Sequence, residues 1–543
     1  MFADALRVPV RLFPGAADDR GMSLTPRDLG MDVPISRRDF FDGIAAGCVA
    51  ATVAPSAAPS AAPSAAPSAA VPARAAQQPS GPPAPRTPFT VLGDTGEALS
   101  VPHALRDGRF WAHAGTPVPT GERYGLVVVG AGRSGLEAAA EWSRRRPRDR
   151  VLVLDNHPEG GARREPLRRG VAFDAVMCDR ESFGADTLVT LSGPGWIDRL
   201  PIDGQAREDL RTLYGDPPDW LPGLSAEAKE ERLAGLTYSA FLREVCGAHP
   251  DAERFCRTMS APEWGYDTRA FGAIDAWGTG YPGFGGLGLD RSRPSRYNSA
   301  TVRAEWHGAS RTRPAPPDVP VRWSSPVVSV RDGARAATVG YFDGHLVRTV
   351  EAGAVILACP SAAVPYLVPD LPEERRRALS RAVRVPLLTA EVRLSDPEAW
   401  RRLGVRRVRW TGAYWCAAEF APPDRVRLLA APCRSELGPD AGSAAGRREL
   451  FRTPYEVFEH TVRDQLARLL GPAGFDPGRG IAAITVHRWG HAIPPEYRRP
   501  WHEFHPDGPS PADAARGRFG RIAIAGSDAG DGAAVLAVEE LTR

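Results

Sequence analysis

YGLVVVGAGRSGLEAAAEWSRRRPRDRVLVLD, residues 124–155, is the most informative stretch of this chain. Residues 124–129 form an apolar, β-branched run of buried-strand length, and a glycine-rich turn follows it. Residues 134–146 are an alanine-rich helical stretch, and Val151–Leu154 is a second apolar run. Strand, turn, helix and strand in this order predict a βαβ unit, in which the two strands are parallel.

The turn of this unit predicts a dinucleotide site. Gly130, Gly132 and Gly135 fill the GxGxxG positions, which need a tight turn, close approach of the backbone to a pyrophosphate, and close contact between helix and strand. Ser134 opens the helix, whose free N–H groups and positive dipole end face the phosphates. Asp155 closes the second strand, where its carboxylate can accept hydrogen bonds from ribose hydroxyls and disfavours a 2′-phosphate.

Asp155 is followed by Gly160, Gly161, Arg163 and Arg164. This order of acid, spacer, glycine pair and arginine resembles FAD-containing amine oxidases, and the resemblance implies FAD rather than NAD. In that group Val327, in a predicted strand over residues 321–330, would hold the adenine through its backbone. Asp528, in a Gly-Ser-Asp turn before a closing helix, would lie against the ribityl and pyrophosphate region. A plain helix cap is the alternative role for Asp528.

The predicted fold class is α/β, with a Rossmann-like FAD-binding domain of the flavin amine oxidase type interleaved with an α+β substrate domain. The FAD-binding domain is expected in three parts and the substrate domain in two, after an N-terminal signal and a linker. The predicted boundaries are 1–54 for the signal region, 55–100 for a linker rich in Pro, Ala and Ser, 101–200, 311–394 and 481–543 for FAD binding, and 201–310 and 395–480 for the substrate domain.

Composition is that of a soluble globular protein, with 43% hydrophobic and 24% charged residues. The net charge of +3 is too small to indicate nucleic acid or a membrane surface as a partner. The cysteines form no CxxC and no Cys/His spacing suited to zinc, so no metal site is predicted. Lys229 is the chain's only lysine, and its polar helical context predicts a solvated side chain.

The N-terminal segment SRRDFFDGIAAGCVAATVA, residues 36–54, looks like a twin-arginine export signal, with Arg37 and Arg38 before a short apolar run. The run is too short for a stable membrane span, and PSAA repeats follow it. Ala73, Arg74 and Ala75 offer a cleavage site, whereas Cys48 is an alternative lipid-attachment site. The expected partner is the twin-arginine export machinery, and the expected location is extracytoplasmic.

Further segments resemble the spermidine dehydrogenase family of exported flavoproteins. They include LGMDVPISRRDF (29–40), HALRDGRFW (103–111), DAWGTGYPGFGGLGL (275–289) and ITVHRWGHA (484–492). The resemblance implies oxidation of an amine C–N bond, such as one of spermidine, by hydride transfer to flavin N5 and an electron acceptor other than oxygen. Some members are associated with b-type haem, for which the possible ligands here are His103, His113, His487 and His491. The chain is shorter than this family after the glycine pair and before residue 321.

Candidate catalytic residues lie in two aromatic segments. Trp489 and Trp277 are candidate substrate walls, because polyamine sites usually have aromatic walls near the flavin, and His491 is a candidate proton acceptor. Core packing for the tryptophans and a structural role for the histidine are the alternatives. For the protein as a whole, the alternatives are a flavin oxidoreductase that acts on another small molecule and a degenerate, non-catalytic relative.

Overall fold

The computed structural model describes residues 88–158, 172–290, 319–494, 499–502, 516–529 and 532–543. All of them belong to one compact unit, Ser68–Arg543. The predicted export signal, the PSAA repeats and the predicted cofactor residues Gly160, Gly161 and Arg163 lie outside the described residues. None of the helices in the described ranges has the length and apolar character required to cross a membrane.

The βαβ unit lies at the centre of a mixed, seven-stranded sheet. β2 pairs in parallel with β3 on one side and with β9 on the other, and β15 pairs in parallel with β9. β7 and β8 continue the sheet as antiparallel strands. The strands of this sheet are β6 (Val321–Arg322), β3 (Val151–Leu154), β2 (Val118–Val129), β9 (Val347–Leu357), β8 (Ala337–Phe342), β7 (Val327–Arg331) and β15 (Ile522–Ile524).

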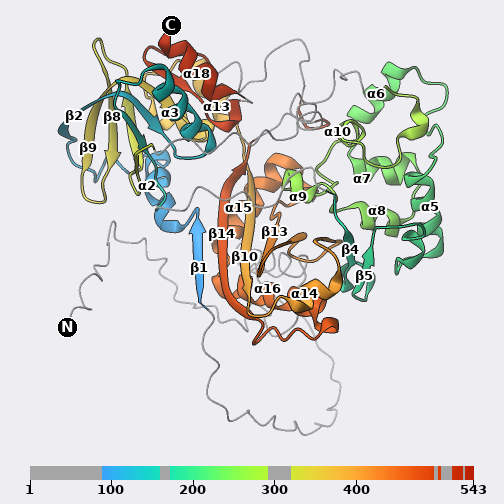
Figure 1. Cartoon of the computed structure of the whole chain (residues 1–543). Coiled ribbons are helices and arrows are strands. Elements are labelled where there is room, and N and C mark those ends of the chain that lie inside the picture. Colours follow the sequence, from blue (N-terminus) through green and yellow to red (C-terminus); the bar gives the residue numbers. More distant parts are fainter. Residues whose placement is uncertain (1–87, 159–171, 291–318, 495–498, 503–515, 530–531) are drawn as a thin grey trace, which may run out of the picture. The chain divides into compact units, whose positions relative to one another are not determined.

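Helices α3 (Arg133–Arg145) and α18 (Ala533–Thr542) pack together on this sheet (Figure 1). Small side chains of α3, such as Ala138 and Ala139, are fully buried against Val128 of β2, so the helix can lie close to the strands. The predicted strands and helix of the βαβ unit, the closing strand and the closing helix are thereby confirmed. β2 begins six residues earlier than predicted, at Val118.

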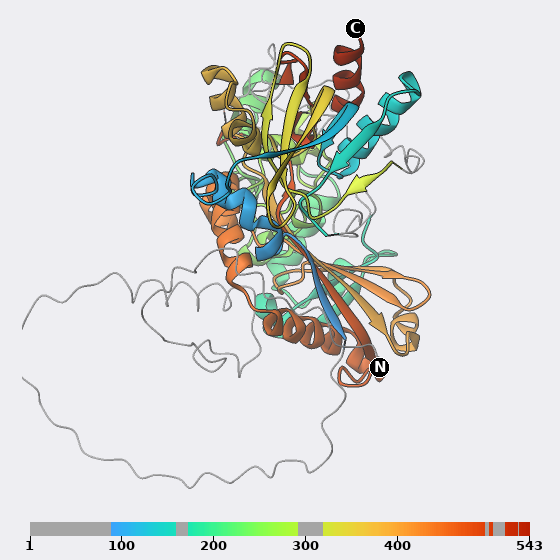
Figure 2. The ribbon, with the colours of Figure 1, turned by 90° about the vertical axis from the view of Figure 1, so that its left-hand side faces the viewer.

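A second, eight-stranded sheet combines segments from most of the described sequence. β1 runs in parallel beside the long strand β14, as Figure 2 shows, and β10 pairs with the other side of β14. The order in the sheet is β1 (Phe89–Gly93), β14 (Ile481–Ile493), β10 (Val385–Leu394), β13 (Arg425–Ala430), β12 (Ala417–Ala421), β11 (Arg407–Trp410), β4 (Ala175–Cys178) and β5 (Thr187–Thr190).

The eight-stranded sheet cuts across the predicted domain segments. β1 falls in the predicted linker, and β10 and β14 fall in predicted FAD-binding segments, yet all three join this sheet. Sheet membership depends on pairing partners far away in the sequence, which no local pattern specifies. The domain boundaries themselves stay predictions.

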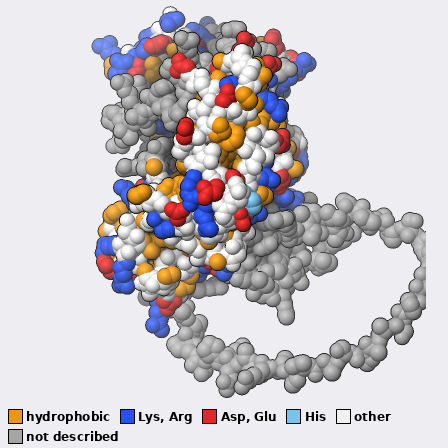
Figure 3. Space-filling view, turned by 90° about the vertical axis from the view of Figure 1, so that its right-hand side faces the viewer, with side chains coloured by type: hydrophobic (Ala, Val, Ile, Leu, Met, Phe, Trp, Pro, Cys, Tyr) orange, Lys and Arg blue, Asp and Glu red, His pale blue; other side chains and the backbone are white. Residues whose placement is uncertain are grey.

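A second hydrophobic core lies among several of the remaining helices, and Trp264, Trp277 and Phe241 are almost completely buried in it. Charged side chains of both signs are interspersed on the face in Figure 3. The helices not yet named are α2 (Gly96–Arg106), α4 (Arg180–Phe183), α5 (Gly204–Tyr214), α6 (Ala226–Ala234), α7 (Tyr238–Ala240), α8 (Pro250–Cys256), α9 (Ala261–Trp264), α10 (Ala273–Gly278), α12 (Val364–Leu367), α13 (Glu373–Ser380), α14 (Glu398–Leu403), α15 (Pro439–Arg452) and α16 (Tyr455–Leu470).

The single strand predicted over residues 321–330 is wrong, because the structure has two short strands there, β6 and β7. β6 pairs with β3, whereas β7 pairs with β8. Between them Ser324 has a φ of 49°, and Pro326 cannot donate a hydrogen bond to a sheet. The chain therefore leaves the parallel strands and turns into an antiparallel hairpin.

The predicted solvation of Lys229 is also wrong. Its side chain is 9% exposed, and Nζ donates hydrogen bonds to Asp219 Oδ2 at 2.7 Å and to the carbonyl of Leu287 at 2.9 Å. The carboxylate of Asp219 compensates the buried charge. Local sequence patterns do not reveal the contact with Leu287, because Leu287 is distant in the sequence.

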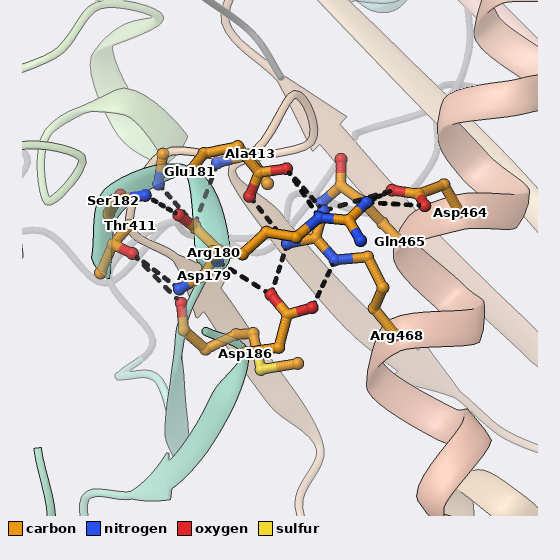
Figure 4. Close-up of polar contacts among 12 residues, drawn as sticks. Asp179, Arg180, Glu181, Ser182, Asp186, Thr411, Ala413, Asp464, Gln465 and Arg468 are labelled. Atoms are coloured by element: carbon orange, nitrogen blue, oxygen red, sulfur yellow. Dashed lines mark hydrogen bonds and ion pairs between the residues drawn. The ribbon is translucent and has the colours of Figure 1, made fainter. Parts of the chain in front are cut away.

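An ion-pair cluster joins the β4–β5 hairpin to α16 (Figure 4). Arg468 of α16 is 8% exposed and contacts the carboxylates of Glu181, Asp186 and Asp464. Arg180 contacts Asp464 from the hairpin side. The charges and hydrogen bonds of Asp186 and Glu181 raise the pKa of Arg468 although its burial opposes this. The cluster fixes the sheet's edge to the helix.

Arg468→Ala leaves three neighbouring carboxylates without their shared cation, and we expect it to cost about 3 kcal/mol of folding free energy. Arg479→Ala is the control, because Arg479 is 93% exposed and reaches only Asp476 at 3.9 Å; we expect it to cost less than about 0.5 kcal/mol. Thermal unfolding of both purified variants measures the difference. Equal melting temperatures for the two variants would show that the cluster contributes nothing.

Candidate functional site

The glycine turn after β2 brings the helix start against the ends of the parallel strands. Gly130 has a φ of +107°, and a Cβ at Gly135 would lie only 1.9 Å from the carbonyl oxygen of Gly130. It would also lie 3.1 Å from Cβ of Ala358, at the end of β9. Gly130 and Gly135 therefore permit the backbone conformation and the close helix–strand contact that the motif predicts.

Gly132 has a different environment from the other two motif glycines. It is the N-cap of α3, no side chain caps the helix there, and a Cβ at this position would meet no atom within 4 Å. Ser134 follows in the first turn and is partly buried. Nearby in the fold, Oγ of the buried Ser361, after β9, makes no hydrogen bond within the described residues. Open space and uncapped helical N–H groups at this edge fit a pyrophosphate.

Asp155 lies directly beside this turn, as predicted, but much of its hydrogen-bonding capacity is used within the protein. Oδ2 accepts the N–H of Ala131 at 2.6 Å, and Oδ1 accepts the N–H of His157 at 2.8 Å. The imidazole Nδ1 of His157 lies 2.8 Å from the same Oδ1. Burial raises the pKa of Asp155, but hydrogen bonding and the charge of His157 outweigh it and hold the pKa below its usual range.

Asp528 is buried in a pair with an arginine that the sequence did not single out. Oδ1 accepts Nε of Arg384 at 2.6 Å, and Oδ2 accepts the N–H of Ser361 at 2.6 Å. The same guanidinium donates to the hydroxyl of Ser527 and, at 3.1 Å, to the carbonyl of His491. Asp528 thus ties the closing turn to the ends of β9 and β14, and its predicted contact with the cofactor stays a prediction.

Strand β14 carries the two candidate catalytic residues beside a bulge. Val385 of β10 pairs with Ile493 and Leu387 pairs with Trp489, so β14 has extra residues between these pairs. Asp94 accepts the N–H of Gly490 at 2.8 Å and that of His491 at 3.3 Å. Bulges commonly occur next to active sites, where they redirect side chains.

The side chain of Trp489 is partly buried and lies close to the predicted cofactor acid. The rings of Trp489 and His157 have centroids 5.6 Å apart in an edge-on arrangement. A Cβ at Gly93 would lie 3.2 Å from the indole, so the backbone of β1 covers one side of it. The sequence predicted Trp489 as a substrate wall, and that role stays a prediction.

The other predicted residues are less favourably placed. Trp277 is 2% exposed in the helical core, which matches the core alternative for it. Burial and then Arg447 lower the pKa of His491 to about 3, so its imidazole is neutral at pH 7 and holds a transferred proton poorly. Val327 is buried at the start of β7, opposite Tyr341. The roles of all three stay predictions.

The described residues contain no group of His, Cys, Asp and Glu side chains suited to a metal ion. The cysteines from Cys178 to Cys433 are all free thiols. His103 lies on α2 and His487 is buried in β14. A haem ligand therefore stays a prediction.

Comparison with known proteins relates part of the chain to a family of flavoproteins. Residues 309–535 match the protein family described as flavin containing amine oxidoreductase. The chain has the flavin amine oxidase fold. This confirms the predicted α/β fold class with its FAD-binding and substrate domains. It also confirms the predicted cofactor, FAD, and the predicted enzyme class, an FAD-dependent oxidoreductase.

Solved structures similar to this flavin amine oxidase fold share little sequence with the chain. Cyclohexylamine oxidase from Brevibacterium oxydans IH-35A is 17% identical with a TM-score of 0.45, and the match covers 77% of this chain and all (100%) of the other. Wild-type putrescine oxidase bound to putrescine is 17% identical with a TM-score of 0.42, over 77% of this chain and 98% of the other. No curated protein matches the sequence.

Residues of the site that sequence reasoning missed are His157, Asp94, Arg384 and Ser361. Each acts through a partner that is distant in the sequence. Asp94 had the clearest local signal, because the apolar run FTVLG precedes it and Thr95 begins a capped helix.

Gly132→Val places a branched side chain in the open space at the start of α3, and we expect FAD affinity to fall at least about tenfold. The fold should tolerate the change, because φ at Gly132 is −67° and no neighbouring atom is displaced. Gly204→Val at the start of α5, which also has open space, is the control. Titration of the apoproteins with FAD measures the affinities. Wild-type affinity in Gly132→Val would contradict the pyrophosphate position.

Proposed function

We propose that the protein is an FAD-dependent amine dehydrogenase that oxidises a C–N bond of a polyamine such as spermidine and passes the electrons to an acceptor other than oxygen. The observation that carries the proposal is the connection between the cofactor turn and the β14 bulge. Asp94 and His157 hold this bulge to the end of β3, and Trp489 lies beside it. Bound FAD would supply the two-electron oxidation.

The first task of the protein is to bind the amine in its neutral form. An alkylammonium has a pKa of about 10, so about one amine in a thousand is neutral at pH 7. An apolar surrounding favours the neutral form, because burial disfavours the charge. Trp489 with the buried side chains Val385 and Leu387 of β10 offers such a surrounding.

A neutral His491 suits this task better than a charged one. An imidazolium beside the substrate would repel an ammonium and compete for the same negative groups. Because burial and Arg447 keep His491 neutral, its imidazole can orient a substrate N–H by accepting a hydrogen bond. We therefore propose an orienting role for His491, in place of the proton acceptor that the sequence suggested.

The choice of a polyamine rests on the resemblance of the sequence to spermidine dehydrogenases. The described residues support an amine substrate in general, through an aromatic wall and a neutral histidine, and they do not by themselves select spermidine. A flavin oxidoreductase that acts on another small molecule is the second candidate, and it shares the cofactor site and differs in the substrate.

Anaerobic mixing of the FAD-loaded protein with amines tests the substrate. We expect spermidine or putrescine to bleach the flavin absorbance, because each can donate two electrons from the carbon next to nitrogen. 1,4-Butanediol, which has putrescine's chain length but no nitrogen, should leave the spectrum unchanged. After bleaching, an artificial electron acceptor should restore the colour at least about tenfold faster than air. Bleaching by the diol alone would reject the amine, and no colour after loading would reject the flavin enzyme.

We further propose that the protein is exported in folded form through the twin-arginine pathway. Arg37 and Arg38 before a short apolar run support this proposal. Folded export also suits a flavoprotein, because the cofactor can be bound before the protein leaves the cell. A cysteine-linked lipid at Cys48 is the alternative fate of the same segment.

Arg37→Lys/Arg38→Lys should abolish export while preserving the positive charge. Arg27→Lys, in the same N-terminal region, is the matched control and should be exported like the wild type. The measurement is the fraction of protein outside the cytoplasm after pulse labelling. Undiminished export of the double variant would contradict the twin-arginine assignment.

A further inference from the structure

The buried carboxylates Asp94 and Asp155 and the mostly buried His157 between them form a continuous polar chain. The imidazole Nδ1 lies 2.8 Å from Asp155 Oδ1, and Nε2 lies 3.0 Å from Asp94 Oδ1. The side chains of His157, Asp94 and Asp155 are 14%, 8% and 5% exposed. Asp94 follows β1 and Asp155 follows β3, so the chain joins strands that belong to different sheets.

The geometry favours a doubly protonated imidazole. A neutral histidine has one N–H and can donate to only one carboxylate, but here both ring nitrogens face a carboxylate oxygen. Burial alone would lower the pKa of His157, yet hydrogen bonds to Asp155 and Asp94 raise it to about 9. The indole of Trp489, edge-on at 5.6 Å, adds a polarisable neighbour. His157 is therefore an imidazolium at neutral pH.

Each carboxylate also contacts a functional part of the backbone. Asp155 holds the N–H of Ala131 in the glycine turn. Asp94 holds two consecutive N–H groups of the β14 bulge, at Gly490 and His491. The carbonyl groups of these two residues accept hydrogen bonds from Arg447 at 2.7 Å and from Arg384 at 3.1 Å. The bulge is thus held by side chains on both sides of its backbone.

We propose that His157 is a positioning residue, which fixes Asp155 for the ribose of the cofactor and links it to the β14 bulge beside Trp489 and His491. This inference rests on the proposed function, since it takes FAD as the ligand. A carboxylate has about four acceptor sites, and the protein fills three on Asp155: two on Oδ1 and one on Oδ2. One site on Oδ2 remains, so Asp155 can accept one ribose hydroxyl.

The stability that the Asp94–His157–Asp155 chain contributes depends on pH, and the neighbouring groups do not titrate in the same range. Cys359 interacts with Asp155, but burial raises the pKa of its thiol to about 12, so the thiol stays protonated at pH 9. The other titratable or charged groups around Asp94 are His103, His491, Arg447 and Arg488. Burial lowers the pKa of both histidines below the ordinary value of about 6.5, and arginine stays protonated, so none of the four titrates near pH 9, where His157 does. The stability that the imidazolium contributes is complete below about pH 6.5, the ordinary histidine pKa, and is lost as pH rises through about 9.

Three variants separate the inference from its alternatives. His157→Gln keeps an amide donor but removes the positive charge. Asp94→Asn removes the carboxylate on the side of His157 away from Asp155. His345→Gln is the control, because His345 lies on an exposed turn between β8 and β9. The first measurement is the melting temperature of each apoprotein between pH 6 and 9.5. The deficit of His157→Gln relative to wild type should be largest at pH 6 and shrink above pH 9, whereas His345→Gln should follow the wild type.

The second measurement is the dissociation constant of FAD, from the quenching of flavin fluorescence. We expect His157→Gln to bind FAD about tenfold more weakly than the wild type at pH 7. Asp94→Asn should bind FAD about fivefold more weakly, although Asp94 contacts the β14 bulge and reaches Asp155 only through His157. Wild-type FAD affinity in Asp94→Asn would overturn the link, and a pH-independent stability deficit in His157→Gln would overturn the imidazolium. A wild-type protein that fails to bind FAD would instead reject the proposed function, while the apoprotein melting still tests the charge chain.

Discussion

The close contact between the start of α3 and the ends of β2 and β9 is the constraint on which the rest of this structure depends. Only a residue without Cβ fits at Gly135, where the helix backbone meets the carbonyl of Gly130. This contact places the uncapped N–H groups of α3 beside Asp155 at one edge of the sheet. The chemistry proposed for the protein requires that this edge and the bulge of β14 remain in fixed positions.

Buried charge maintains those positions across the two sheets. The imidazolium of His157 compensates two carboxylates, and the Arg384–Asp528 pair joins the closing turn to the carbonyl of His491. Charged groups are costly to bury unless they are paired and hydrogen-bonded, and here each pair also satisfies backbone groups. The aromatic and apolar residues beside β14 can then exclude water from the bulge, where the N–H and C=O groups of Gly490 and His491 are all hydrogen-bonded.

The βαβ unit could be predicted from the sequence because its signals are local: two apolar runs, three spaced glycines and an acid. The break between β6 and β7 could not, since it arises when one segment pairs with β3 and the next with β8. The burial of Lys229 and the contacts of His157 depend on Leu287 and Asp94, which are distant in the sequence. Trp489 was identified by residue type and position alone, whereas the residues that orient it were found only in the structure.

Strand β1 has a consequence for processing of the polypeptide. It is the first described element, it forms the edge of the eight-stranded sheet beside β14, and Asp94 follows it immediately. A protease that cut after Gly93 would therefore remove the edge strand and leave the carboxylate at a free, mobile amino terminus. If the protein is processed during the proposed export, the cut must fall before Phe89 for this strand to be kept, as it would at the proposed site near Ala75.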